Sequence, residues 1–309
     1  MQNPVPLPEN IRSVQPGGGF CYGIELAWGR WRRWYLKTFR RGYVARMAAL
    51  RRGDATGAPH EILDPRDLKY CSNQCTAHWA PEDDPFQWRE RLPLARWGLA
   101  ELQIMGWPLA ALVAALGALG PPWCYAAAAP LALLALIVYF FRDPRREAPS
   151  DPDAVVSPAD GVVAEVTPLD RYDFLDGPAV RIGIFLSIFN VHINRAPRAG
   201  RVVDMHYKPG KFLNALNPES AIRNEFMWIG FEDQQRPGLR YAVRQISGLL
   251  ARRIVCALRP GQAVRRGEKF GMIKLGSRTE LILPRDAVTV ETAVGDAVRA
   301  GVTVLARLH

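Results

Sequence analysis

The stretch KFGMIKLGSRTELILP, residues 269–284, consists of two short apolar runs with Gly276-Ser277 between them. Short runs of β-type residues bounded by Gly or Pro indicate strands. Runs of the same kind fill most of residues 147–309: AVVSPADGVVAEVTPL, AVRIGIFLSIF, YAVRQISG, RIVCALRP, AVTVETAVG and VTVLARLH. Together they predict a compact, mainly antiparallel β domain.

The segment before the β domain is strongly apolar. From Leu102 to Phe141 it runs for 40 residues without a charged side chain, and Gly120-Pro121-Pro122 interrupts it near the middle. Because a helix needs about 20 apolar residues to cross a bilayer, the segment predicts two spans joined by a tight turn. Arginines flank both ends: Arg91, Arg96, Arg142, Arg145 and Arg146. Positive charge at both ends places both in the cytoplasm. A buried hairpin of a soluble protein is the alternative.

The N-terminal part has a basic segment of its own. Residues 28–52, WGRWRRWYLKTFRRGYVARMAALRR, carry nine Lys or Arg and no acid, with Trp28, Trp31 and Tyr35 at roughly helical spacing. Aromatic residues interleaved with cations are typical of a helix in the headgroup layer of an anionic membrane. A solvated basic helix, or one docked on the protein itself, is the alternative.

Three parts follow from these patterns. Residues 1–96 form an extension of unknown role with a basic aromatic helix, residues 97–146 a transmembrane or membrane-embedded helical hairpin, and residues 147–309 the β domain. The predicted class is α+β. Two turn-and-strand pieces of the β domain, residues 157–166 and 295–308, look alike in the way of barrel-sandwich modules, so we expect a barrel-sandwich-like domain.

The net charge and the cysteine content indicate which kinds of molecule the protein binds and in which cellular compartment it lies. The net charge is +10 and the pI is about 9.7, which favours an anionic partner such as a membrane surface. No nucleic-acid reader motif accompanies the charge, so we expect no nucleic acid. The five scattered cysteines argue against a disulfide framework and suit a reducing compartment. The pattern Cys71-x3-Cys75-x2-His78 lacks a second ligand pair, so we expect no metal site. We see no signal peptide.

Four segments of the β domain occur in an order that is informative as a set. They are SPADG (157–161), FLSIFNVHINRAP (185–197), Asn224-Glu225, and FGMIKLGSRTEL (270–281). With the apolar stretch ending in FFRDP (140–144), these segments resemble the phosphatidylserine decarboxylase family in sequence, order and spacing. The resemblance extends over about residues 100–309 and leaves the N-terminal extension unexplained.

The resemblance implies that the chain cuts itself between Gly276 and Ser277. In the family the serine hydroxyl attacks the preceding glycine carbonyl, an acyl shift gives an ester, and elimination then cleaves the chain. Glycine suits the upstream position because it tolerates strained backbone angles and leaves its carbonyl unshielded. Serine is a weak nucleophile by itself, so we expect His192 as the base and Asp160 as the group that orients it. His206 is a reserve candidate for the base.

The same resemblance implies the cofactor, the reaction and the partners. Ser277 would become a pyruvoyl group that forms a Schiff base with the substrate amine and acts as the electron sink for decarboxylation, with no separate cofactor or metal. The expected substrate is phosphatidylserine within anionic membrane lipid, and the product is phosphatidylethanolamine. Residues 277–309 would remain bound to residues 1–276 as a heterodimer, whose further assembly is left open. The expected location is the inner cell membrane, with the catalytic domain in the cytoplasm.

One position departs from part of the family. The longer bacterial members carry a His-x-x-His pair in the second segment, whereas here His192 is followed by Arg195. The site also reads LGSR rather than LGST, so the chain resembles the shorter, single-histidine branch. Either His192 serves both self-cleavage and later proton transfer, or Arg195 holds the phosphate or carboxylate of the substrate, since a guanidinium suits both anions.

Two other functions compete with this one. A non-catalytic, membrane-tethered adaptor resembling biotinyl or lipoyl modules would need a lysine displayed at a hairpin tip, and Lys274 in MIKLG does not match that pattern. A decarboxylase of another serine-headed lipid is the second alternative.

Overall fold

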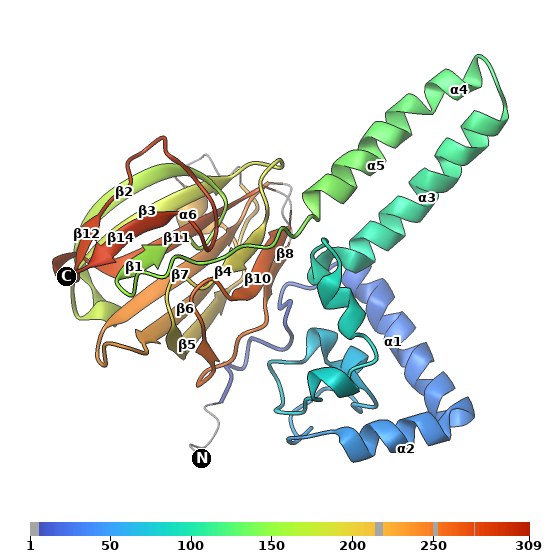
Figure 1. The fold of residues 1–309 in the computed structure, drawn as a ribbon, viewed down its shortest axis with the longest axis horizontal. Coiled ribbons are helices and arrows are strands. Elements are labelled where there is room, and N and C mark those ends of the chain that lie inside the picture. Colours follow the sequence, from blue (N-terminus) through green and yellow to red (C-terminus); the bar gives the residue numbers. More distant parts are fainter. Residues whose placement is uncertain (1–5, 214–218, 250–252, 275) are drawn as a thin grey trace.

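The computed structural model describes residues 6–213, 219–249, 253–274 and 276–309. Helices fill the N-terminal half and strands the C-terminal half, so the predicted α+β class is confirmed (Figure 1). The helices are α1 (Phe20–Phe39), α2 (Arg41–Leu50), α3 (Leu99–Ala118), α4 (Trp123–Ala126), α5 (Ala128–Phe140) and α6 (Ser220–Arg223). Short 3-10 helices lie at Pro65–Tyr70, Pro81–Asp83, Gln87–Arg91, Arg96–Gly98, Asp173–Leu175 and Arg285–Ala287.

The β domain is antiparallel, as predicted. Its strands are β1 (Ala154–Val156), β2 (Gly161–Tyr172), β3 (Gly177–Leu186), β4 (Ile193–Arg195), β5 (Gly200–Lys208), β6 (Phe226–Asp233), β7 (Arg240–Ser247), β8 (Arg253–Cys256), β9 (Ala263–Val264), β10 (Lys269–Lys274), β11 (Ser277–Pro284), β12 (Val288–Val290), β13 (Ala297–Val298) and β14 (Val304–Leu308). The largest sheet has eight strands in the order β13-β2-β3-β11-β7-β6-β5-β9. Two three-stranded sheets, β1-β14-β12 and β4-β10-β8, complete the domain.

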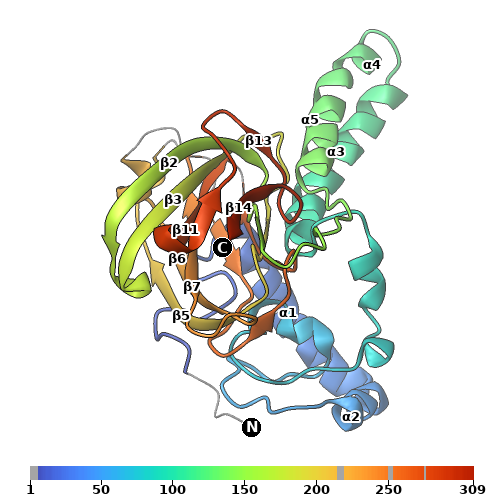
Figure 2. The same ribbon diagram turned by 60° about the vertical axis from the view of Figure 1, so that its left-hand side comes forward.

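The large sheet curls into a half-barrel around an apolar core (Figure 2). Aliphatic side chains of β3 and β11 alternate into this core with the two-residue period of a strand, and Phe231 and Tyr241 stack beside them with ring centroids 5.0 Å apart. The hydroxyl of Tyr241 donates to the carbonyl of Arg198 at 3.0 Å, so this buried polar group is satisfied. Strand β11 is central in the sheet and is buried along nearly its whole length.

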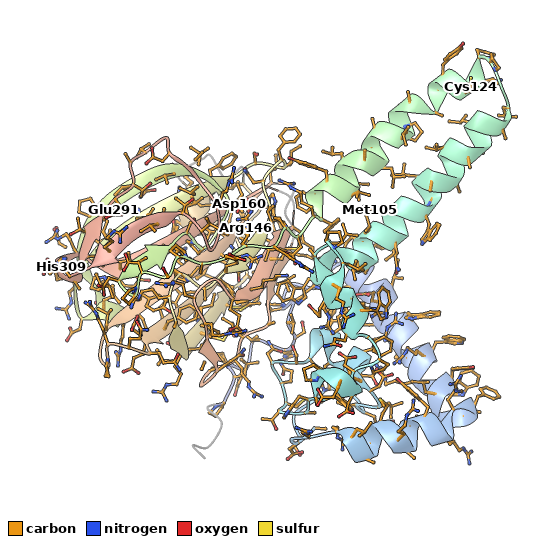
Figure 3. The ribbon with its side chains drawn as sticks, viewed as in Figure 1. Met105, Cys124, Arg146, Asp160, Glu291 and His309 are labelled. Atoms are coloured by element: carbon orange, nitrogen blue, oxygen red, sulfur yellow. The ribbon has the colours of Figure 1, made fainter. Side chains whose placement is uncertain are left out.

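The apolar segment forms an antiparallel pair of helices that projects away from the β domain (Figure 1). The stretches Arg96–Ala118 and Trp123–Phe140 are long and apolar enough to cross a membrane, with mean hydropathy 1.6 and 1.9. Little of either stretch is buried within the protein, and Cys124 marks the exposed end of the pair (Figure 3). The predicted turn at Gly120-Pro121-Pro122 joins the two helices, with Gly120 at a left-handed φ of 70°.

The basic N-terminal segment forms two helices rather than one, with the break at Arg40. Helix α1 has two different faces. On one, Arg32 is buried and forms an ion pair with Asp64. On the other, exposed rings form a row, with Trp31 stacked between Trp28 and Tyr35 at centroid distances of 4.8 and 5.8 Å.

Residues 53–96 pack beside α2 as a small unit. Cys71 and Cys75 lie buried in its apolar cluster with Met47, Ile62 and Trp79. In the described part of the chain, no group of three His, Cys, Asp or Glu side chains is arranged to hold a metal ion.

We expect Gly161→Ala to destabilise the protein more than Gly238→Ala. Both glycines have positive φ, 153° and 87°, but an added Cβ at residue 161 would lie 2.0 Å from the carbonyl oxygen of Phe185, whereas residue 238 has open space. The first substitution should cost at least about 3 kcal/mol and the second about 1 kcal/mol. Thermal unfolding in detergent micelles measures both, and equal shifts of the midpoint would contradict the close packing inferred for Gly161.

Candidate active site

The peptide bond between Gly276 and Ser277 lies where the chain crosses from one sheet to another. Strand β10 ends at Lys274 in the β4-β10-β8 sheet, and β11 begins at Ser277 in the eight-stranded sheet. Gly276 has a φ of 66°, in the left-handed region that glycine adopts without steric cost. The bond is therefore anchored by a different sheet on each side and carries a backbone geometry that few other residues tolerate.

The side chain of Ser277 is buried and has no hydrogen-bond partner. Its residue pairs with Leu186 of β3 on one side and Ser247 of β7 on the other. The hydroxyl oxygen is inaccessible and finds no donor or acceptor among the described residues. Such a group costs about 1–3 kcal/mol of desolvation, so its retention points to a chemical rather than a structural role.

His192 lies directly beside this bond as a neutral base. Its Nε2 is 3.2 Å from the backbone nitrogen of Gly276, and its Nδ1 is 3.0 Å from the carbonyl oxygen of Asn190. A carbonyl only accepts, so Nδ1 carries the proton, and the lone pair of Nε2 accepts the hydrogen bond that the Gly276 N–H donates; the tautomer is assigned from these partners. Burial lowers the pKa of His192 from 6.5 to about 4, against the opposing effects of the Asn190 hydrogen bond and the Asp160 charge.

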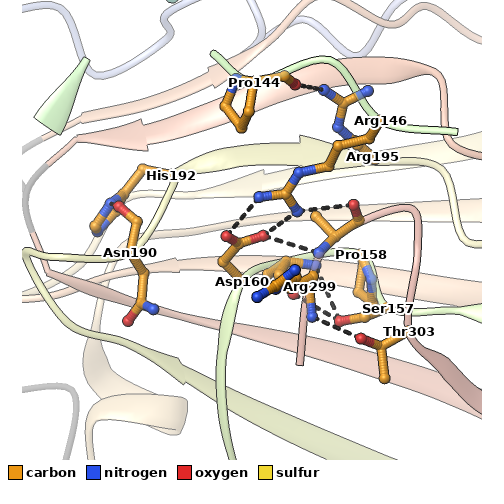
Figure 4. A network of polar contacts seen from close by, with 12 residues as sticks. Pro144, Arg146, Ser157, Pro158, Asp160, Asn190, His192, Arg195, Arg299 and Thr303 are labelled. Atoms are coloured by element: carbon orange, nitrogen blue, oxygen red, sulfur yellow. Dashed lines mark hydrogen bonds and ion pairs between the residues drawn. The ribbon is translucent and has the colours of Figure 1, made fainter. Parts of the chain in front are cut away.

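Asp160 contacts Arg146 and Ala300 rather than His192. Both carboxylate oxygens face the guanidinium of Arg146, with Nη2 to Oδ2 at 2.7 Å, and the backbone N–H of Ala300 donates to Oδ1 at 2.8 Å. Figure 4 shows this pair, with His192 to one side beside Asn190. Among the contacts of the described residues, Asp160 makes no hydrogen bond to His192. In this uncut chain the Asn190 carbonyl orients the imidazole, while Asp160 acts on it through charge, and the orienting role of Asp160 stays a prediction.

The four sequence segments meet around Ser277. Asn194, buried in the second segment, donates to the hydroxyl of Thr279 in the fourth at 3.0 Å and to the carbonyl of Pro158 in the first at 3.3 Å. Asn224 of the third segment donates to the carbonyl of Ser247, the β7 partner of Ser277, at 2.7 Å. Segments far apart in sequence are thus joined by buried hydrogen bonds to the strand that begins at Ser277.

Arg195 is buried and already paired. Its guanidinium contacts the carboxylate of Asp143 at 3.3 Å and the carbonyls of Gly267 and Pro144 at 3.0 and 3.3 Å. Contact with a substrate anion therefore has to compete with these partners, and the substrate-binding role of Arg195 stays a prediction. The reserve candidate His206 is exposed on β5, separated from β11 by β7 and β6.

Two buried charge groups beside the site were missed in the sequence. Lys274 lies two residues before Gly276 and forms a 2.5 Å ion pair with Glu101 at the start of α3, which ties the end of β10 to the apolar helices. Burial lowers the pKa of this lysine, and only 5% of it is exposed, so it cannot act as the displayed lysine of a carrier module. Glu101 is the acid that directly precedes the uncharged run, and this position in the sequence could have indicated that it is buried and paired.

The second group lies directly after Ser277. Arg278 contacts Glu280 at 2.9 Å and also pairs with Glu165 of β2, while Glu280 pairs with Arg244 of β7 at 2.9 Å. The i, i+2 spacing of Arg278 and Glu280 places both on one face of the strand, which is the pattern that could have revealed the pair. These contacts hold the first residues of β11 independently of the peptide bond before them.

Comparison with known proteins adds independent information. The family model described as phosphatidylserine decarboxylase matches residues 133–306. A phosphatidylserine decarboxylase proenzyme of Rhodopirellula baltica is 52% identical over 241 residues, which cover 78% of this chain and 98% of the relative. Proenzymes of the same name from Carboxydothermus hydrogenoformans and Desulfotalea psychrophila are 46% and 45% identical, over 57% and 56% of this chain and 81% and 80% of the relatives.

We expect Arg278→Met to destabilise the uncut protein strongly. The change leaves Glu165 with Arg181 and the buried Glu280 with Arg244, so each acid loses one of two arginine partners, which should cost about 2–3 kcal/mol. Arg307→Met is the matched control, since Arg307 also contacts two acids, Asp151 and Glu291, but lies exposed, where such pairs contribute less than about 1 kcal/mol. Thermal midpoints in a Ser277→Ala background make the comparison, and similar midpoints for both variants would contradict the anchoring role.

Proposed function

The chain belongs to the phosphatidylserine decarboxylase family, and on that premise we propose that it is a proenzyme that cleaves itself before Ser277 and then converts phosphatidylserine to phosphatidylethanolamine. The observation that carries the proposal is the buried, partnerless hydroxyl of Ser277 beside left-handed Gly276 and neutral His192. These features fit a residue that is consumed to make a pyruvoyl group.

Self-cleavage begins with the Ser277 hydroxyl. Its oxygen attacks the carbonyl carbon of Gly276, the peptide C–N bond breaks, and the amine of Ser277 takes up a proton as the ester forms. Removal of the Cα proton of residue 277 then expels the carboxylate of Gly276 and leaves dehydroalanine, whose hydrolysis consumes water and releases ammonia. The resulting pyruvoyl group supplies the electron sink for loss of carbon dioxide.

His192 is the proposed base for both proton removals. Its Nε2 accepts a hydrogen bond from the N–H of Gly276, whose carbonyl is attacked, so the lone pair has to exchange this donor for the Ser277 hydroxyl before it takes a proton. Burial keeps the imidazole neutral at pH 7. The Asn190 carbonyl fixes the ring, and the carboxylate of Asp160, which Arg146 partly neutralises, favours the imidazolium once a proton is taken.

Cleavage would leave two chains that stay together, residues 1–276 and 277–309. Strands of the short chain pair with strands of the long one: β11 with β3 and β7, β13 with β2, and β14 with β1. This interleaving supports a stable heterodimer.

The helical parts support attachment to a membrane. Helices α3 to α5 would cross the inner membrane as a hairpin, with the arginine-rich flanks and the β domain in the cytoplasm. The ring row of α1 would lie in the headgroup layer, because its arginine Arg32 is turned inward to Asp64 and the rings face outward.

Ser277→Ala should abolish decarboxylation. Without the hydroxyl no ester forms and no pyruvoyl group arises, so carbon dioxide release from carboxyl-labelled phosphatidylserine in mixed micelles should fall to background. The thermal midpoint of the variant is the control for folding. Substantial carbon dioxide release from a folded Ser277→Ala protein would refute the proposal.

Self-cleavage should resist mild acid. The pKa of His192 is lowered to about 4, so the base stays neutral as pH falls through 6.5 and is protonated only near pH 4. Precursor made by cell-free synthesis with detergent, then shifted to buffers between pH 4 and 8, should cleave at a constant rate down to about pH 5. A half-maximal rate near pH 6.5 would contradict a buried neutral base.

A further inference from the structure

A cleft with strong positive charge opens at the base of the apolar helices. Its volume is about 930 Å³. Six cations line it: Arg142, Arg145, Arg146, Arg195, Lys269 and Arg299. They come from the segment that follows α5, from β4 and β10, and from the loop before β14, so several separate parts of the β domain contribute charge to one hollow.

Three of these cations form ion pairs with two acids of the protein, and the other three do not. Arg146 pairs with Asp160, and both Arg195 and Lys269 pair with Asp143. The remaining three have no carboxylate partner in the described part of the chain. Arg142 donates only to carbonyls, those of Tyr139 and Phe189, and Arg145 and Arg299 are exposed. Besides Asp160, the lining contains the acid Glu147, so its cations still outnumber its acids and the excess positive charge suits an anion.

An apolar groove of about 570 Å³ lies on the other side of the same segment. Side chains of α3 and α5, Met105 and Ile137 among them, form its walls together with Ile188 of the loop after β3. Its two charged members, Glu101 and Lys274, neutralise each other. The groove is continuous with the exposed faces of the two apolar helices, which are the part of the protein that suits a bilayer.

The two hollows lie on either side of two short segments, and the buried His192 lies next to one of them. Phe140 and Phe141 line the groove and the next residue, Arg142, lines the cleft. In the same way Ile188 lines the groove and Val191 lines the cleft. His192 follows Val191, and its ring lies 4.5 Å from that of Phe140. A molecule with an apolar chain in the groove and an anion in the cleft would therefore cross the Phe141–Arg142 boundary, whose neighbour Phe140 covers the buried ring of His192.

We propose that the groove and the cleft together bind one glycerophospholipid molecule, with an acyl chain in the groove and the phosphate held by Arg142, Arg145 and Arg299. This inference rests on the proposed function, since the bound lipid would be its substrate. Guanidinium groups suit phosphate oxygens in geometry and charge. Arg195 then supports the wall of the cleft through Asp143 rather than contacting the anion.

Binding to the uncut Ser277→Ala protein tests the site without depending on catalysis. Calorimetric titration in maltoside micelles would use dihexanoylphosphatidylserine, glycerophosphoserine and inorganic phosphate as ligands. We expect the lipid to bind at least about tenfold more tightly than glycerophosphoserine, because only the lipid buries acyl carbons. Equal affinity of these two would overturn the role of the groove, and inorganic phosphate binding as tightly as the lipid would identify a free-phosphate site instead.

The double variant Arg145→Gln/Arg299→Gln tests the cleft. Because both side chains are exposed, the fold should be kept, and the affinity for dihexanoylphosphatidylserine should fall about tenfold. Arg171→Gln/Arg285→Gln removes the same charge from exposed positions outside the cleft and should leave the affinity unchanged. Equal affinity of the two double variants would overturn the proposal.

The same variants made with Ser277 intact separate this proposal from the function it rests on. The cleft variant should cleave itself fully and show a KM for phosphatidylserine about tenfold higher, with kcat changed less than about twofold. Full cleavage with an unchanged KM would overturn the lipid site alone. A wild-type protein that releases no carbon dioxide would refute the proposed function instead.

Discussion

The active site depends on one constraint, which is that the chain passes from one β sheet to another within two residues. Strand β10 is held by β4 and β8 up to Lys274, and β11 is held by β3 and β7 from Ser277 onward. Only Gly276, in a left-handed conformation, and the residue before it lie between these anchors. Because both flanks are fixed by their own hydrogen bonds, the connecting bond can be broken without loss of either sheet.

Burial sets the chemistry of this crossing. It leaves the Ser277 hydroxyl without a partner among the described residues and disfavours the charged form of His192, so the proposed nucleophile and the proposed base are both buried. The nearby charges are mostly paired, as in Arg146 with Asp160 and Lys274 with Glu101, which limits the electrostatic cost of burying them. Those pairs also connect the site to the helices on which attachment to a bilayer would depend.

The sequence alone predicted the secondary-structure elements and the main site residues, but not which side chains contact one another. Short apolar runs predicted the antiparallel β domain, and the residues Gly276, Ser277 and His192 could be named because four segments occur in a recognisable order. The partners of each side chain depend on tertiary packing. Nothing in the sequence reveals that a backbone carbonyl, that of Asn190, would hold the imidazole while Arg146 takes up Asp160. The sequence places Arg32 on a basic surface, whereas the structure buries it in an ion pair with Asp64, a residue of another segment.

The central claim is that this crossing is where the protein cuts itself, and the mass of the purified protein tests it most directly. Intact-mass spectrometry should give two chains that end at Gly276 and begin at residue 277, the shorter carrying a pyruvoyl group in place of the serine. The corresponding Ser277→Ala protein should give a single chain. A single uncut chain of 34.5 kDa in folded wild-type protein would contradict the account.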